Sequence, residues 1–180
     1  MRRIGRILAF QALYSWSVGG IEIDDLLDFS WIERDQFEDE KKEGSSEVQE
    51  IEEGEKPVPV NNVKYFLSDG LYQNFEGFDA DKKSEIFTFA RLLIKGTIEN
   101  IKEIDSLIES HLSDKWSLDR INKVALSVMR ISVYEMLYQK STAASIVIDE
   151  AVEIVKSYGE DDSHKFTNAV LDKISKDLEK

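Results

Sequence analysis

Three arginines stand in the first six residues, and no acidic residue precedes Glu22. On a helix, Arg2 and Arg6 lie one turn apart on the same side, with Arg3 beside them. The planar guanidinium group suits phosphate oxygens and base edges, and it also stacks on bases. Positive charge at a helix N-terminus opposes the helix dipole, as expected where function selects the residue. The pattern predicts a small nucleic-acid contact. Composition alone supports the alternative, a solvated chain end, equally well.

A second candidate is the stretch SYGEDDSHKF, residues 157–166. One helix is expected to end at the glycine, and a new helix to begin after a short acidic turn. Tyr158 or Phe166 would stack on an unpaired base, and Asp162 would accept hydrogen bonds from base amino groups. A well-capped corner between two helices is the alternative, and general physical considerations favour it.

Motifs for catalysis are lacking in the sequence. It contains no glycine-rich phosphate loop and no dinucleotide fingerprint. The absence of cysteine excludes disulfides, a thiol nucleophile and cysteine-ligated metals. Neither of the two histidines belongs to the Glu-x-x-His pair that a di-iron helical bundle requires. We therefore expect a binding protein rather than an enzyme, without a cofactor or a metal ion.

The acidic residues are unevenly distributed along the chain. The formal net charge of −13 argues against a generic polyanion binder. Residues 33–56, however, contain eleven acidic and four basic residues, so this segment alone carries −7. Its high charge and weak periodicity predict that residues 33–62 form an acidic, flexible insertion.

Hydrophobic periodicity elsewhere is helical, and no segment alternates with a period of two. The expected fold is all-α, one domain with two packed helical lobes at about 1–112 and 117–180. Ser117 is the expected N-cap of a strongly apolar helix. No apolar run reaches about 18 residues, so we expect a soluble, cytoplasmic protein. The expected helices are 2–18, 22–32, 63–75, 84–112, 118–138, 142–158 and 163–178.

Three stretches together resemble one family. They are RRIGR followed by QALYSW, then MRISVYEM, and then IDEAVEIVKSYGEDDSHKFTNAVLDKI. In this order they resemble the NusB family of transcription antitermination factors, over residues 2–18 and about 84–176. The resemblance implies a NusB-like bundle of two packed three-helix lobes that binds single-stranded boxA RNA of ribosomal RNA transcripts. It also implies a small-subunit ribosomal protein as partner and read-through by RNA polymerase within that complex.

The resemblance also implies which residues contact RNA, and it explains why positive charge is concentrated at one helix end. Ile4 and Gly5 interrupt the family's arginine cluster, which predicts fewer phosphate contacts and a shallower salt dependence. By position, the implied RNA-binding residues are Arg2, Arg3, Arg6, Tyr14, Tyr158, Asp162 and Phe166.

Other functions remain open at this stage. A helical protein-binding adaptor or homodimer without RNA specificity of its own is the main alternative. An RNA-binding domain of the kind fused to ribosomal RNA methyltransferases is less favoured, since no cofactor-binding domain follows Lys180. The helix at 118–138 is a candidate partner surface because its apolar residues fill more than one stripe, although a buried central helix has the same pattern. The acidic segment 33–62 is more readily a solvated spacer than an RNA mimic.

Overall fold

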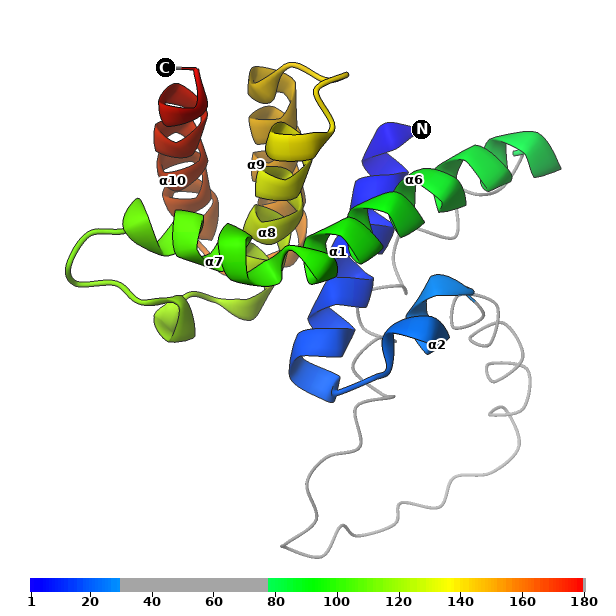
Figure 1. Cartoon of the computed structure of the whole chain (residues 1–180), viewed down its shortest axis with the longest axis horizontal. Coiled ribbons are helices and arrows are strands. Elements are labelled where there is room, and N and C mark those ends of the chain that lie inside the picture. Colours follow the sequence, from blue (N-terminus) through cyan, green and yellow to red (C-terminus); the bar gives the residue numbers. More distant parts are fainter. Residues whose placement is uncertain (30–77, 180) are drawn as a thin grey trace, which may run out of the picture.

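The computed structural model describes residues 1–29 and 78–179 (Figure 1). Every regular element in these two ranges is helical, which confirms the all-α class. No helix within them is long and apolar enough to cross a membrane. The acidic segment and the helix expected at 63–75 lie outside the described residues. In chain order the elements are α1 (Arg2–Gly19), α2 (Ile23–Leu27), α6 (Ala80–Glu99), α7 (Ile101–Ser110), the 3-10 turn η2 (Leu118–Arg120), α8 (Lys123–Tyr138), α9 (Ala144–Tyr158) and α10 (Ser163–Leu178).

Helix α8 is the centre of the bundle. It packs against α1, α6 and α7 and also against α9 and α10, and Figure 1 shows it between these two sets. Eleven of its sixteen residues are buried, on all sides of the helix. A helix that is apolar all round is expected to be enclosed by others. Its several apolar stripes therefore reflect this central position, and α8 has no wide free face for a partner.

Helix α1 packs between α6 and α8. The run from Gly5 to Leu13 is buried throughout, so the helix passes through the core rather than along its edge. It ends as the glycine pair predicts. Gly20 adopts the left-handed conformation with φ 63°, and its amide donates to the carbonyl oxygen of Trp16 at 3.2 Å.

Two of the expected helix boundaries are wrong. The single helix expected at 84–112 is interrupted at Asn100, whose Nδ2 donates to the carbonyl oxygen of Gly96 at 2.8 Å. The long helix expected after Ser117 begins later, because residues 118–120 form a 3-10 turn. Asn122 is the true cap of α8, and its side-chain oxygen accepts from the amides of Val124 and Ala125 at 2.9 and 3.2 Å.

The expected second helix also differs from the structure. Helix α2 ends at Leu27, and Phe29 has a φ of 59°, which is incompatible with a continuing right-handed helix. By contrast, α9 and α10 fall within two residues of their expected ranges. The buried core is continuous across the first and last helices. The division into two lobes remains a prediction.

Candidate nucleic-acid interface

Arg2 is exposed at the start of α1 and contacts the loop between α8 and α9. Its Nη1 donates to Ser141 Oγ at 3.1 Å and also to Thr142 Oγ1. The guanidinium carbon lies 5.4 Å from the ring centroid of Phe89 on α6. Both hydroxyl partners are neutral, so the positive charge of Arg2 remains available to an anion.

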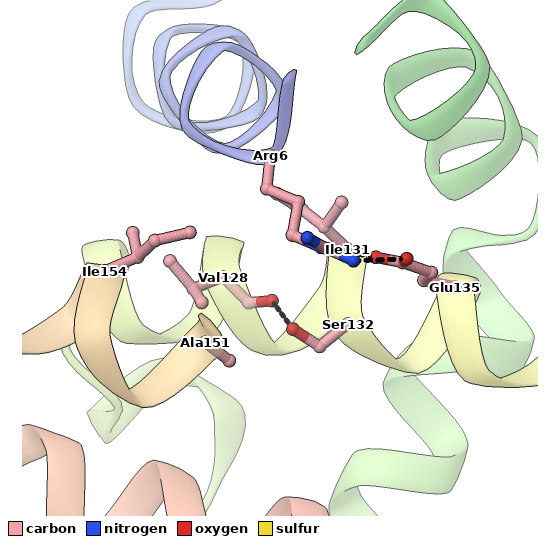
Figure 2. A pocket seen from close by; sticks show the side chains of 7 residues that line it. All are labelled: Arg6, Val128, Ile131, Ser132, Glu135, Ala151 and Ile154. Carbon is pink, nitrogen blue, oxygen red and sulfur yellow. Dashed lines mark hydrogen bonds and ion pairs between the residues drawn. The ribbon is translucent and has the colours of Figure 1, made fainter. Parts of the chain in front are cut away.

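Arg6 does not belong to the exposed positive surface, contrary to expectation. Its residue is 5% exposed, and its partner Glu135 on α8 is 1% exposed. Nε and Nη2 of Arg6 donate to the two carboxylate oxygens of Glu135 at 2.8 and 2.7 Å, as Figure 2 shows. This bidentate geometry is the strongest form of ion pair between side chains. The expectation of three uncompensated arginines is therefore wrong, because Arg6 faces α8 and is neutralised there.

A small cavity adjoins this ion pair (Figure 2). Its volume is about 10 Å³, close to the minimum that holds one water molecule. It is too small for a nucleotide or a cofactor. Within residues 1–29 and 78–179, no three His, Asp or Glu side chains are placed to hold a metal ion. The residues lining the cavity are Arg6, Val128, Ile131, Ser132, Glu135, Ala151 and Ile154.

Arg3 faces α9 and keeps a side-chain exposure of 48%. Its Nε lies 4.0 Å from Glu150 Oε2, a distance that gives only a weak, solvated ion pair. Seven residues further along α1, Phe10 packs on Tyr158 with ring centroids 5.1 Å apart. The helical period places Tyr14 on the same side of α1 as Arg3 and Phe10. One side of α1 thus presents a cation and an aromatic residue beside the end of α9.

Tyr158 is half-buried at the last position of α9. Burial raises the pKa of its phenol, and the nearby charge of Arg3 acts in the opposite direction. Arg3 lies beside Glu150 on α9, and Phe10 on the same side of α1 packs on Tyr158 at the end of α9. The structure therefore places two residues that are 155 positions apart, and that were both expected in the site, where α1 meets α9.

The corner after Tyr158 lacks the side-chain cap of a well-capped helix. Asp162 occupies the N-cap position of α10 with a φ of 65°, but its carboxylate turns to Lys165 instead of the helix amides. Its Oδ1 lies 2.6 Å from Lys165 Nζ, and this hydrogen bond lowers the pKa of Asp162. The carboxylate stays ionised and exposed. An acceptor for base amino groups is thus present at the corner.

Phe166 lies one turn into α10 and packs on a residue that the sequence analysis missed. Its ring centroid is 4.9 Å from that of Trp116, at an interplanar angle of 38°. The guanidinium carbon of Arg120 lies 6.0 Å from the same indole ring. The stretch KWSLDR has an aromatic residue between two cations, a signal that was available in the sequence. Trp116 was overlooked because the segment was treated only as a connection between lobes.

The expected site residues therefore lie in separate places. Arg3, Tyr158, Asp162 and Phe166 follow one another from α1 across the corner to α10. Tyr14 lies on the same side of α1, while Arg2 lies at the loop between α8 and α9. Arg6 is internal. The surface combines exposed cations, aromatic rings and an acceptor, which defines the chain as an all-helical protein with a small polar and aromatic interface.

Comparison with known proteins identifies the family. The pattern of the NusB family matches residues 60–176. The transcription antitermination protein NusB of Treponema denticola is 40% identical over 173 residues, which cover 96% of this chain and 94% of that protein. The protein of the same name from Treponema pallidum is 34% identical over 175 residues, 97% of this chain and 92% of its own length. The chain belongs to the NusB family of transcription antitermination factors.

Solved structures share the fold. T. maritima NusB superposes with a TM-score of 0.59 at 29% identity, covering 98% of this chain and 91% of that chain. A chain of the crystal structure of the antitermination factors NusB and NusE in complex with dsRNA has a TM-score of 0.62 at 24% identity. That superposition covers 98% of this chain and 96% of that chain. The NusB-like bundle expected from the sequence is thereby confirmed.

Proposed function

We propose that this chain binds single-stranded boxA RNA of ribosomal RNA transcripts together with a small-subunit ribosomal protein. In that complex it promotes read-through of terminators by RNA polymerase. Family membership supports the general role, and a solved relative was crystallised with NusE and RNA. The observation that supports the RNA contact is that Arg3 and Tyr158 lie where α1 meets α9, and that the corner at Asp162 follows Tyr158.

The chemistry of this surface suits a short, unpaired RNA. Exposed guanidinium groups at Arg2 and Arg3 suit phosphate oxygens, whose contacts provide affinity without reading sequence. Tyr158 offers a partly accessible ring beside them for an unstacked base. Asp162 offers a carboxylate that accepts hydrogen bonds from exocyclic amino groups. A cation, a ring and an acceptor in succession favour a single strand over a duplex.

Arg6 has a different role in this proposal. Its guanidinium is enclosed and occupied by Glu135, so it does not contact phosphate. The ion pair instead fixes the rotation of α1 relative to α8. That rotation determines that Arg3 faces α9 and that Arg2 faces the loop between α8 and α9. Arg6 is therefore a positioning residue for the two exposed arginines.

The proposal is tested by fluorescence anisotropy with a labelled boxA RNA and a scrambled RNA of the same composition. Both titrations are run with and without the ribosomal protein. We expect preferential binding of boxA RNA that tightens when the partner is present. The variant Arg2→Ala/Arg3→Ala is expected to bind at least tenfold more weakly, since two charge-assisted contacts are lost.

A matched control removes two lysines that are not among the proposed RNA contacts. Lys82 and Lys95 are exposed on α6, and Lys82→Ala/Lys95→Ala changes the net charge equally. This variant is expected to bind RNA like the wild type. Equal or absent binding of both RNAs by the wild type, even with the partner, would overturn the proposal. The helical protein-binding adaptor would then be the better account.

A further inference from the structure

Trp116 is an exposed aromatic residue held in a fixed setting. It is 45% exposed, and one side of its indole packs on the half-buried ring of Phe166. Arg120 places its guanidinium 6.0 Å from the same ring. A large ring supported on one side and left open to solvent is a recurrent platform for stacking an unpaired base.

The segment around this ring is closed by its own hydrogen bonds. The amide of Trp116 donates to the carbonyl oxygen of Ser113 at 2.8 Å, and that of Arg120 donates to Ser117 at 3.0 Å. Nη1 of Arg120 donates to the carbonyl oxygen of Lys115 at 2.9 Å. These bonds keep the indole and the guanidinium in register before any ligand arrives. A preorganised platform loses less conformational entropy on binding than a mobile one.

We propose that Trp116 and Arg120 stack and hold one unpaired base of the RNA, beyond the base read at the corner. The inference rests on the proposed RNA-binding function and extends its surface. The occupant is argued from continuity, because Phe166 lies between Trp116 and the corner at Asp162. It is also argued from chemistry, since a guanidinium beside an indole favours the π-face and the phosphate of a nucleotide.

Local charge shows which force dominates at this platform. Lys115 and Arg120 are exposed in the same segment as Asp114 and Asp119, so the positive and negative charges balance. Phosphate neutralisation therefore contributes little here, and stacking supplies the affinity. Loss of the ring should weaken RNA binding without changing the salt dependence, which separates Trp116 from the two exposed arginines of α1.

The first experiment compares Trp116→Ala with Trp116→Phe in the RNA titration. The alanine variant is expected to bind boxA RNA about tenfold more weakly, within the range known for one stacked base. The phenylalanine variant keeps a stacking face and is expected to stay within about twofold of wild type. An exposed apolar residue on α6 provides the control, because Leu92→Ala truncates a side chain that is not among the proposed RNA contacts.

The second experiment locates the base. Abasic nucleotides are placed at each position of the RNA in turn. At one position, the wild type should bind the abasic RNA about tenfold more weakly than intact RNA. The Trp116→Ala variant should bind that abasic RNA no more weakly than it binds intact RNA. Coupling of this kind arises only where ring and base interact. Circular dichroism and thermal unfolding of each variant check that the bundle is intact.

Intrinsic fluorescence gives an independent readout. The chain has three tryptophans, at positions 16, 31 and 116. Stacking of a base on Trp116 should quench emission in the wild type, and the quench should be smaller in Trp116→Phe although RNA still binds. If wild type prefers boxA RNA while Trp116→Ala binds it equally well with equal quenching, the platform is refuted and the proposed function stands.

Two other results would also overturn this inference. If the wild type does not distinguish boxA from scrambled RNA, the proposed function fails and the platform fails with it. If Trp116→Ala binds RNA normally but binds the ribosomal protein more weakly, Trp116 serves a protein contact instead of a base.

Discussion

Arg6 and Glu135 join the start of α1 to the last turn of α8 through a bidentate ion pair inside the bundle. Two buried charges are tolerable only while each neutralises the other. Loss of one partner therefore affects stability very differently from loss of both. Removing one partner leaves an unpaired charge in the core, whereas replacing both with apolar side chains removes the problem.

Glu135→Ala is expected to lower the free energy of unfolding by about 3–5 kcal/mol, because the guanidinium of Arg6 remains buried and unpaired. The double variant Arg6→Met/Glu135→Leu should recover most of that loss. Urea unfolding followed by circular dichroism measures both. The exposed pair of Lys95 and Glu99 is the control, and Glu99→Ala should change stability by less than about 1 kcal/mol. A double variant as unstable as Glu135→Ala would contradict this account.

Tyr158 gives a pH-dependent prediction. Burial raises the pKa of its phenol above the usual value, so the folded state holds this proton more tightly than the unfolded chain. The contribution to stability is complete below about pH 10 and is lost as pH rises through the folded-state pKa. Wild type should therefore lose thermal stability between about pH 9 and 11 more steeply than Tyr158→Phe. Parallel curves would mean that the phenol is not protected.

At the scale of elements, α6 and α8 approach closely because Gly96 has no side chain. A Cβ placed on Gly96 would lie 2.0 Å from Cζ of Tyr134. That tyrosine is buried and packs on Tyr138 with ring centroids 5.2 Å apart, so it has little room to move. At Gly5 on α1 the first contact is Cδ1 of Phe89 at 2.7 Å, on a ring that is only partly buried.

Gly96→Ala should therefore destabilise the bundle by about 1–3 kcal/mol, the usual range for overpacking a core. The gain in helix propensity, about 0.5–1 kcal/mol, offsets only part of this loss. Gly5→Ala combines the same two effects, but the partly buried ring of Phe89 can move away. The loss of stability in this variant should therefore be smaller. Thermal unfolding of both variants compares them. A Gly96→Ala protein as stable as wild type would show that α6 and α8 can separate without penalty.

The sequence predicted helices well where local signals mark their ends. Helix α1 ends at a glycine that needs a positive φ, and α9 ends just before Gly159. The break at Asn100 was missed because the hydrophobic period continues from α6 into α7 across it. The start of α8 was misplaced because Ser117 and Asn122 are both good caps, and only tertiary packing decides between them.

The candidate site was less predictable than the helices. No local pattern reveals that Arg6 is neutralised, because Glu135 lies 129 positions away. Phe166 was singled out without its neighbour, since the sequence does not show that Trp116 lies beside it. Residue type and spacing identify which side chains are suited to RNA. Which of them reach the surface depends on packing between helices.

At the scale of the whole molecule, the proposed RNA contact is local on an acidic protein. The chain carries a formal net charge of −13, and two exposed arginines, Arg2 and Arg3, stand at the start of α1. Single-stranded RNA loses about 0.7 in the slope of log affinity against log salt for each phosphate neutralised. We expect a shallow slope near −1.4 from these two contacts, and a decrease by about 0.7 in Arg2→Ala or Arg3→Ala.

Titrations at several salt concentrations measure this slope. Trp116→Ala is the informative comparison, since it should shift the line to weaker affinity and leave its slope unchanged. A slope steeper than about −4 in the wild type would mean that many more cations contact the RNA than the two exposed arginines of α1.

The proposed interface joins residues that are far apart along the chain, and this has a consequence for synthesis. Arg3 is made well before Tyr158 and Asp162. At ordinary rates of translation, roughly 6–26 s separate the emergence of Arg6 from that of Glu135, 129 residues later. Until then α1 has no partner for its inward-facing charge. On the proposed function, a nascent chain that has not yet reached Glu135 and Tyr158 therefore has no assembled surface for RNA.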